Sequence, residues 1–114
     1  MQEFPKAYRE FRRRNPAVAR AYEDLGKACV GAGPLDARTR ELVKLGMSIG
    51  GGLEGAVHSH VRRALEAGAT PDEIRHVVAL AVPTIGFPAT AAAFTWVEDL
   101  LGGGPPAPKR SRRS

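Results

Sequence analysis

The sequence is poor in cysteine and has no long uninterrupted apolar run. Cys29 is the only cysteine, which excludes an intrachain disulfide, a CxxC redox pair and a four-cysteine zinc site. The longest apolar candidate, residues 77–94, is broken by two prolines and a glycine, and no stretch reaches the about 20 residues that cross a bilayer. The N-terminus lacks the apolar core of a signal peptide. We therefore predict a cytoplasmic protein with no membrane partner.

Basic charge is scarce in the middle of the chain. The net charge is +5, but residues 1–20 (six basic and two acidic side chains) and residues 102–114 (four basic side chains) hold all of the excess. Few aromatic residues accompany these basic runs and no DNA-reading motif is present, so we expect solvated charge and no specific nucleic-acid binding. Because residues 102–114 have almost no apolar content, they are predicted to form a disordered basic tail.

Alternation of polar and apolar residues with period two is also missing, whereas helical spacing recurs along the chain. The strongest helix start is Thr70-Pro-Asp-Glu73, which has a Thr cap, Pro at N1 and Glu at N3. Pro83 is expected to end this helix and Pro88 to open the last one. The sequence predicts one all-α domain over residues 1–101, with about five to six helices.

The last predicted helix, residues 91–101, has alanine on more than one side together with the alanines just before it. Small side chains permit close approach of another helix, whereas an isolated monomer would more naturally show one polar face here. We therefore expect a homo-oligomer.

Residues 50–60, GGGLEGAVHSH, contain the chain's most chemically varied stretch. Gly50, Gly52 and Gly55 match the dinucleotide fingerprint G-x-G-x-x-G. That fingerprint works only between a strand and a helix, and the preceding residues 41–49 are predicted to be helical. The glycines are better explained as a joint between two helices, and no cofactor is expected.

The two histidines of this stretch are predicted to differ. On a helix His58 and His60 lie about 200° apart, so they cannot bind one metal ion together from this element. Glu54, His58 and Arg62 share a face that is expected to be a solvated charge stripe, and no metal site is predicted.

His60 falls beside Val57 and Ala64 on the apolar side of its predicted helix. A buried imidazole needs a hydrogen-bond partner, and Glu41, at the edge of the preceding helix's apolar stripe, is a candidate. Two simpler alternatives stay open: His60 is a satisfied core histidine, and Glu41 is a first-turn carboxylate that the helix dipole favours. Cys29 falls on an apolar stripe, and a buried cysteine there would be inert.

Three segments resemble the carboxymuconolactone decarboxylase family, which includes the alkyl hydroperoxidase D enzymes. They are LDARTRELVKLGMSIG (35–50), HVRRALEAGATPDEIRHVVALA (60–81) and GFPATAAAF (86–94). The resemblance covers residues 35–101 and implies an all-α helical core, assembled in the family as a ring-shaped oligomer. We expect a trimer or a hexamer on this basis.

The peroxidase branch of that family carries the motif E-x11-C-x2-C-x3-H. Glu41 and His60 match its glutamate and histidine, while Leu53 and Ala56 stand at the two cysteine positions. Neither residue can attack a peroxide or close a disulfide, so thiol peroxidase activity is predicted to be absent. The chain is thus identified as a divergent member without the CxxC pair.

The decarboxylase branch implies acid–base chemistry on a small lactone acid. In that case the resemblance implies that His60 is the general acid or base and that Glu41 orients it or shares its proton. Leu53 and Ala56 would line the pocket, and Arg62 or Arg63 would meet a substrate carboxylate. Two alternatives remain: a non-catalytic member that binds a ligand or partner, and a redox protein that uses Cys29 between subunits.

Overall fold

The computed structural model describes residues 4–102, which form six α-helices and no strand. The predicted all-α fold is therefore confirmed, while all but the first residue of the predicted tail lies outside the described residues. No helix within residues 4–102 is both long and apolar enough to cross a membrane. The helices are α1 (Lys6–Arg14), α2 (Pro16–Val30), α3 (Ala37–Gly51), α4 (Glu54–Glu66), α5 (Pro71–Ile85) and α6 (Phe87–Leu101).

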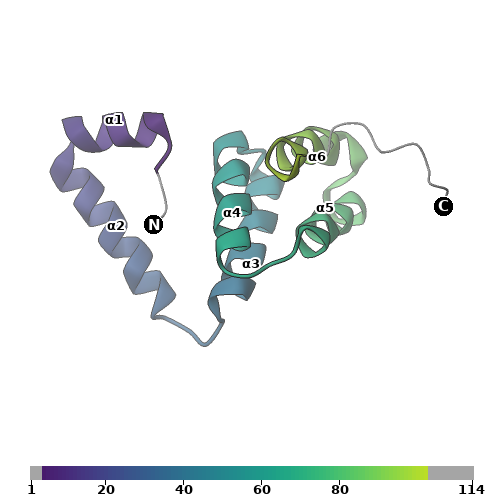
Figure 1. The fold of residues 1–114 in the computed structure, drawn as a ribbon, viewed down its shortest axis with the longest axis horizontal. Helices are drawn as coiled ribbons and strands as arrows, with labels where there is room; N and C mark the ends of the chain where they lie inside the picture. Colours follow the sequence, from purple (N-terminus) through teal and green to yellow (C-terminus); the bar gives the residue numbers. More distant parts are fainter. Residues whose placement is uncertain (1–3, 103–114) are drawn as a thin grey trace. The chain divides into compact units, whose positions relative to one another are not determined.

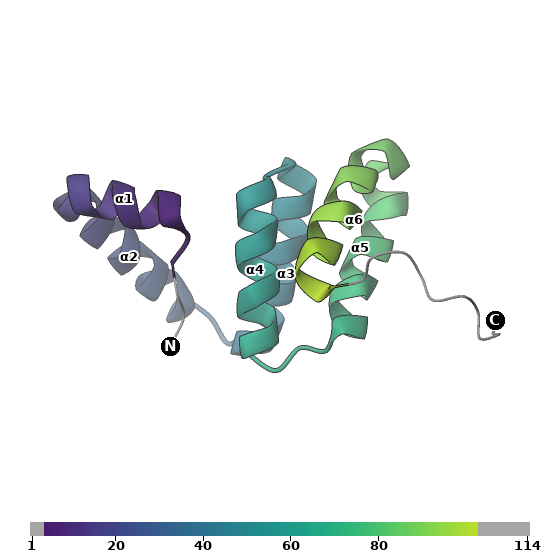
Figure 2. The same cartoon turned by 45° about the horizontal axis from the view of Figure 1, so that its top comes forward.

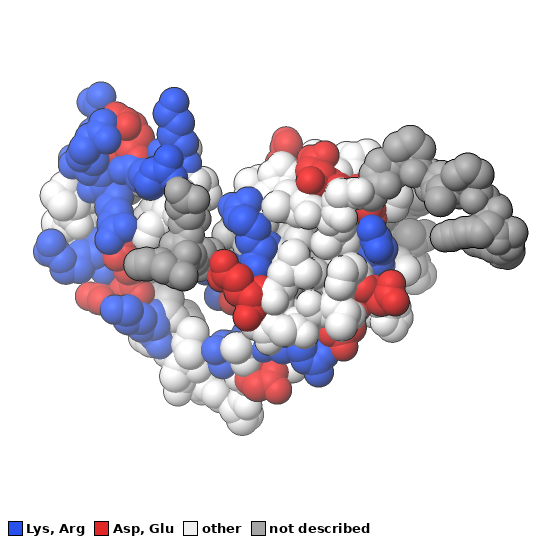
Figure 3. Space-filling model, in the orientation of Figure 1, with Lys and Arg blue, Asp and Glu red and all other residues white. Residues whose placement is uncertain are grey.

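The chain divides into two compact units, Met1–Asp36 and Ala37–Ser114. The first holds α1 and α2, and the second holds the other four helices (Figure 1). On the face shown in Figure 3, Lys and Arg side chains gather over the first unit, while the second carries mixed charge and broad uncharged areas. The assignment of residues 1–101 to a single domain stays a prediction.

In the first unit, α1 and α2 meet through a small polar and aromatic cluster. The Tyr8 hydroxyl donates a 2.9 Å hydrogen bond to Glu23 Oε2, and the Tyr8 and Tyr22 rings lie 6.2 Å apart between centroids. The apolar stripe predicted on α2 is not buried, because Leu25 is 59% exposed. Cys29 is exposed as well, so the prediction of a buried cysteine is wrong.

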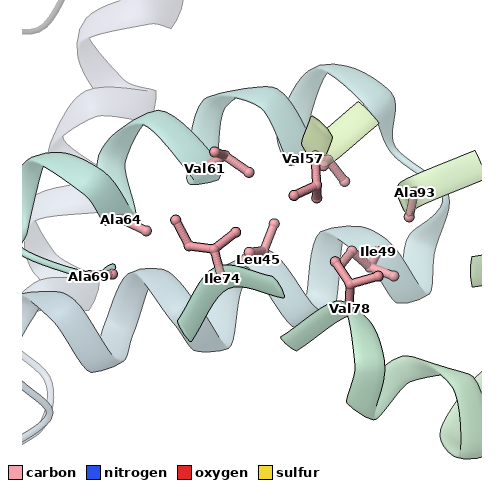
Figure 4. Close-up of a cluster of buried hydrophobic side chains, with 10 residues drawn as sticks. Leu45, Ile49, Val57, Val61, Ala64, Ala69, Ile74, Val78 and Ala93 are labelled. Carbon is pink, nitrogen blue, oxygen red and sulfur yellow. The ribbon is translucent and has the colours of Figure 1, made fainter. Parts of the chain in front are cut away.

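In the second unit, α3 packs on α4 and α5, and α6 packs on the same two helices, which closes a four-helix arrangement (Figure 2). Apolar side chains from all four helices and from the loop after α4 point toward one another at its centre (Figure 4). Burying one such aliphatic side chain stabilises the fold by about 1.5–3 kcal/mol. The buried members are Leu45, Ile49, Val57, Val61, Ala64, Ala69, Ile74, Val78, Ala93 and Val97.

A tight turn at Gly52 joins α3 to α4. Gly52 has φ of +66°, a conformation that costs glycine little, and its N–H donates to Ile49 O over 3.0 Å. The Leu53 N–H then reaches back to Ser48 O at 3.1 Å. The glycine run therefore ends one helix and permits an immediate start of the next, as the sequence predicts.

The capping box at the start of α5 is present as predicted. Glu73 N–H donates to the Thr70 hydroxyl at 3.1 Å, and Thr70 N–H donates to the Glu73 carboxylate at 3.0 Å. The predicted end of this helix at Pro83 is wrong, because α5 continues to Ile85. An interior proline loses one hydrogen bond and crowds the carbonyl four residues earlier, but here the helix continues past it for two residues. It stops where Gly86 takes φ of +91°.

Candidate acid–base site

The central feature of the candidate site is a direct contact between α3 and α4. His60 Nδ1 and Glu41 Oε1 lie 2.7 Å apart, and the two side chains are only 16% and 14% exposed. An ionised carboxylate can only accept a hydrogen bond, so Nδ1 is the nitrogen that donates. The partner that the sequence proposes for His60 is therefore the one that it contacts.

Both residues stand at the edges of buried stripes. Glu41 precedes the fully buried Leu45 by one turn of α3, and His60 precedes the fully buried Ala64 by one turn of α4. The short turn at Gly52 makes the two helices neighbours, which brings these edges together across 19 residues of sequence. The packing of the two stripes thus sets the imidazole against the carboxylate.

The other ring nitrogen of His60, Nε2, forms no hydrogen bond among the described residues. Within residues 4–102 the only buried side-chain nitrogen or oxygen without a partner is Nε of Arg63. The His60 side chain as a whole is 16% exposed. The imidazole is therefore held at Nδ1, and Nε2 has no hydrogen bond within residues 4–102.

Arg63 lies on the same side of α4 as His60, because residues three apart on a helix are neighbours. Its Nε is buried without a partner within residues 4–102, which leaves one donor of the guanidinium unsatisfied. Arg62 differs, since it is one turn from His58 and lies on that residue's side of the helix. Of the two arginines proposed from the sequence, only Arg63 is placed beside His60.

Leu53 and Ala56 stand where the peroxidase motif has cysteines. Leu53 is the N-cap residue of α4 and is 56% exposed, while Ala56 is half-buried and one turn before His60. Their side chains offer no thiol on this side of α4.

The opposite edge of α4 carries a second histidine–carboxylate pair, which the sequence does not predict. His58 Nε2 lies 3.1 Å from Asp99 Oδ2 of α6, with side chains that are 25% and 57% exposed. The expectation of a freely solvated stripe is thus wrong for His58. The sequence does not reveal this contact, because 41 residues separate the two side chains and the contact depends on how α6 packs. The one signal in the sequence is the spacing of Glu54 and His58, which places these two side chains on one face of α4.

Two surface hollows lie elsewhere on the second unit. One of about 420 Å³ lies between α3 and α5, and one of about 230 Å³ lies between α5 and α6. Neither is lined by His60 or Glu41. The larger hollow is mainly apolar, with Leu42, Val43, Val77, Leu80, Ala81 and Ile85 in its lining.

The smaller hollow is bordered by an ion pair between α5 and α6. Arg75 donates from Nε and Nη2 to the two Glu98 carboxylate oxygens, both at 2.9 Å. These hydrogen bonds from Arg75 hold the pKa of Glu98 below its usual range, against the opposing effect of burial. The pair links the two helices that follow the candidate site.

These features define an all-α protein whose α3–α4 hairpin presents an imidazole–carboxylate pair. The chain belongs to the carboxymuconolactone decarboxylase family, whose model matches residues 16–99, well over half of its length. The resemblance noted from the sequence is thereby confirmed at the level of the family. No curated protein and no solved structure matches the chain.

Proposed function

We propose that this protein is a non-thiol enzyme that transfers a proton to or from a small carboxylic acid or lactone, with His60 as the general acid or base. One observation carries the proposal. His60 is anchored through Nδ1 to Glu41 at 2.7 Å, while its Nε2 has no hydrogen bond among the described residues and the side chain is 16% exposed. A general base oriented by a carboxylate at its far nitrogen is a recurring catalytic arrangement.

Decarboxylation is the reaction that this arrangement suits best. The bond to the carboxyl carbon breaks, CO₂ leaves, and the electron pair stays on the substrate as an enolate or carbanion. A proton must then be supplied, and protonated His60 gives it from Nε2. Glu41 stabilises the imidazolium before transfer and holds the ring in place. General acid–base catalysis of this kind contributes about 10²–10⁴-fold.

Arg63 is the proposed contact for the substrate carboxylate. It is a neighbour of His60 on α4, and its buried Nε lacks a partner within residues 4–102. A carboxylate bound in the fork of a guanidinium makes charge-assisted hydrogen bonds, which are roughly twice as strong as neutral ones. Leu53 and Ala56 would border the bound substrate and exclude water from one side.

We also propose a homo-oligomer, a trimer or a hexamer. Large apolar residues of the second unit are strongly exposed, among them Met47 (69%), Leu80 (56%) and Phe87 (62%). Met47 and Leu80 lie on α3 and α5, the two helices that border the larger hollow, and Leu80 is part of its lining. Exposed apolar side chains also meet at the larger hollow, where Val43 (42%) and Ile85 (37%) join Leu80, and an apolar patch of this kind is typical of an interface. Light scattering on wild type and on Leu80→Glu tests this: a smaller mass for the variant is expected, and a monomeric wild type would contradict it.

The catalytic proposal is tested with a panel of small carboxylic acids and lactones. Thermal unfolding is measured first for wild type with each compound, and CO₂ release is then assayed for those that stabilise it. His60→Gln is expected to lower kcat by about 10²–10⁴-fold, because glutamine cannot exchange a proton. His58→Gln is the matched control, two residues away on the other edge of α4, and should retain wild-type turnover.

Arg63→Gln separates binding from chemistry. If Arg63 holds the carboxylate, this variant should raise KM more than it lowers kcat. Turnover that survives His60→Gln would overturn the proposed role of His60. Stabilisation by no compound, or equal stabilisation of wild type and His60→Gln without turnover, would favour the second candidate.

That second candidate is a non-catalytic member of the family that binds a ligand or a partner. It is favoured by one observation: His60 and Glu41 pair with each other, and neither described hollow includes them. In this case the pair has only a structural task. His60→Gln would then lower the stability of the protein and leave ligand binding elsewhere unchanged.

A further inference from the structure

The edge of α4 opposite His60 gathers three metal-ligating side chains that the proposed function does not use. Glu54 and His58 come from α4 and Asp99 comes from α6. One possible ligand atom from each lies within 4.8 Å of the other two. We propose that Glu54, His58 and Asp99 form a binding site for a divalent transition-metal ion of the Zn²⁺ type.

Helix geometry explains the first two ligands. Glu54 and His58 are four residues apart in α4, so their side chains lie one above the other on the same side of the helix. Spacing of this kind is how helices present pairs of ligands to one ion. Glu54 begins the helix and is exposed, so its long side chain is free to adjust toward a bound cation.

The third ligand depends on the packing of α6 against α4. Val57 of α4 and Val97 of α6 are both fully buried in the core, which fixes the neighbouring surface positions of the two helices. Asp99 thereby places Oδ2 3.1 Å from Nε2 of His58. This is an arrangement between two elements, unlike a chance run of acidic residues along one loop.

The separation of these two atoms suits a shared ion. Zinc binds histidine nitrogen and carboxylate oxygen at about 2.0–2.2 Å. Two ligands of one tetrahedral or octahedral ion are then about 3.0–3.5 Å apart, by simple geometry from those bond lengths. The observed 3.1 Å falls in that range, and only the Glu54 carboxylate must move closer. Water would complete the coordination, since the site opens to solvent.

The ligand set favours one class of metal. An imidazole with two carboxylates suits Zn²⁺ and its first-row neighbours, whereas Mg²⁺ and Ca²⁺ prefer oxygen ligands alone. The sequence alone predicts no metal here, because Glu54 and His58 share their helix face with Arg62 and look like part of a solvated charge stripe. The site is also independent of the acid–base proposal, since His60 and Glu41 lie on the other edge of α4.

The test uses the full chain with Cys29→Ser throughout, because the exposed thiol of Cys29 would itself bind zinc. Zn²⁺ binding is measured by calorimetry and by the shift in Tm, and Co²⁺ absorption reports the ligand geometry. One ion per chain is expected, with a Tm increase of several degrees at saturating Zn²⁺. His58→Gln, Asp99→Asn and Glu54→Gln should each weaken binding by at least tenfold.

His60→Gln is the matched control, because it removes a histidine from the same helix and should leave Zn²⁺ affinity unchanged. His76→Gln, at an exposed position of α5, serves as a second control for surface histidines. The proposal would be overturned if the Cys29→Ser protein bound no Zn²⁺. It would also be overturned if adding His58→Gln or Asp99→Asn to that protein left its Zn²⁺ affinity unchanged. Loss of binding in His60→Gln alone would likewise place the ion elsewhere.

Discussion

Two histidines on one helix lie in contrasting surroundings. His60 faces α3, is 16% exposed and contacts a carboxylate that is 14% exposed, whereas His58 faces α6 and contacts a carboxylate that is 57% exposed. Both pairs have the same chemistry and similar distances. What distinguishes them is access to water, which weakens an ion pair and leaves room for a competing ligand.

The difference begins with position on the helix. The buried face of α4 carries Val57, Val61 and Ala64, and the two histidines flank that face on opposite sides. On one side the neighbouring helix supplies Glu41 from within its own buried edge. On the other side α6 supplies Asp99 from an exposed position near its C-terminal end. We call His60–Glu41 the inner pair and His58–Asp99 the outer pair. The inner pair is suited to holding the His60 ring in one orientation, and the outer pair to binding a ligand that exchanges with solvent.

The largest expected effect comes from breaking the inner pair. His60→Ala leaves the Glu41 carboxylate poorly solvated and without its partner, and should lower the free energy of unfolding by about 2–3 kcal/mol. His58→Ala, by contrast, should cost less than about 1 kcal/mol, because Asp99 remains hydrated. Urea unfolding of the two variants makes the measurement, and equal losses would contradict the contrast.

Coupling energies sharpen the same comparison. A double-mutant cycle with Glu41→Gln and His60→Gln should give a coupling of about 1–2 kcal/mol, because both partners are shielded from water. The corresponding cycle with Asp99→Asn and His58→Gln should give about 0.2–1 kcal/mol. An outer coupling that exceeded the inner one would mean that burial does not rank these pairs.

A third ion pair, Arg75–Glu98, contains no histidine and provides a reference whose expected pH dependence follows from the lowered pKa of Glu98. Because Arg75 holds the folded-state pKa of Glu98 below the unfolded value of about 4.3, the pair stabilises the fold above that pH. The contribution is lost as the pH falls through the lowered pKa of the folded state. Arg75 is 43% exposed, so Arg75→Met should cost less than about 1 kcal/mol at pH 7.

Unfolding of wild type and Arg75→Met is measured from pH 7 down to pH 3. The difference between the two should be constant near neutrality and shrink below about pH 4. A difference that grew on acidification would show that Arg75 acts by another route than Glu98.

The smallest expected effect is that of salt. At 1 M NaCl the screening length is about 3 Å, so the outer His58–Asp99 coupling should fall by a few tenths of a kcal/mol. The inner coupling should change less, because its two side chains are only 16% and 14% exposed and are less accessible to ions. Repeating both cycles at pH 5.5 in 0.05 M and 1 M NaCl measures this. Equal sensitivity to salt would mean that the inner pair is also open to solvent.

Local signals in the sequence predicted much of the fold. The capping box at Thr70 and Glu73 satisfies backbone groups within one turn, so no distant residue is needed to infer it. The glycine joint is equally local. The end of α5 was missed because Pro83 looks like a terminus, whereas the real stop is the positive φ of Gly86.

The site divides in the same way. Glu41 and His60 could be paired from the sequence because adjacent helices joined by a short turn must be neighbours, and the family motif has the same spacing. Asp99 could not be paired with His58, because the angle at which α6 crosses α4 depends on core packing. The exposure of Cys29 was not predicted, because an apolar stripe on a helix indicates a surface that burial would stabilise. The stripe does not show whether another element covers that surface.

The tight turn at Gly52 sets the register between Glu41 and His60. Because the Leu53 N–H bonds to Ser48 O across this turn, the spacing of 19 residues determines where the two side chains lie along α3 and α4. One residue added to α4 before His60 would rotate that side chain by about 100° and lift it by about 1.5 Å. Single substitutions along this hairpin should therefore leave the spacing of Glu41 and His60 unchanged. A single insertion or deletion between the two residues would break their contact.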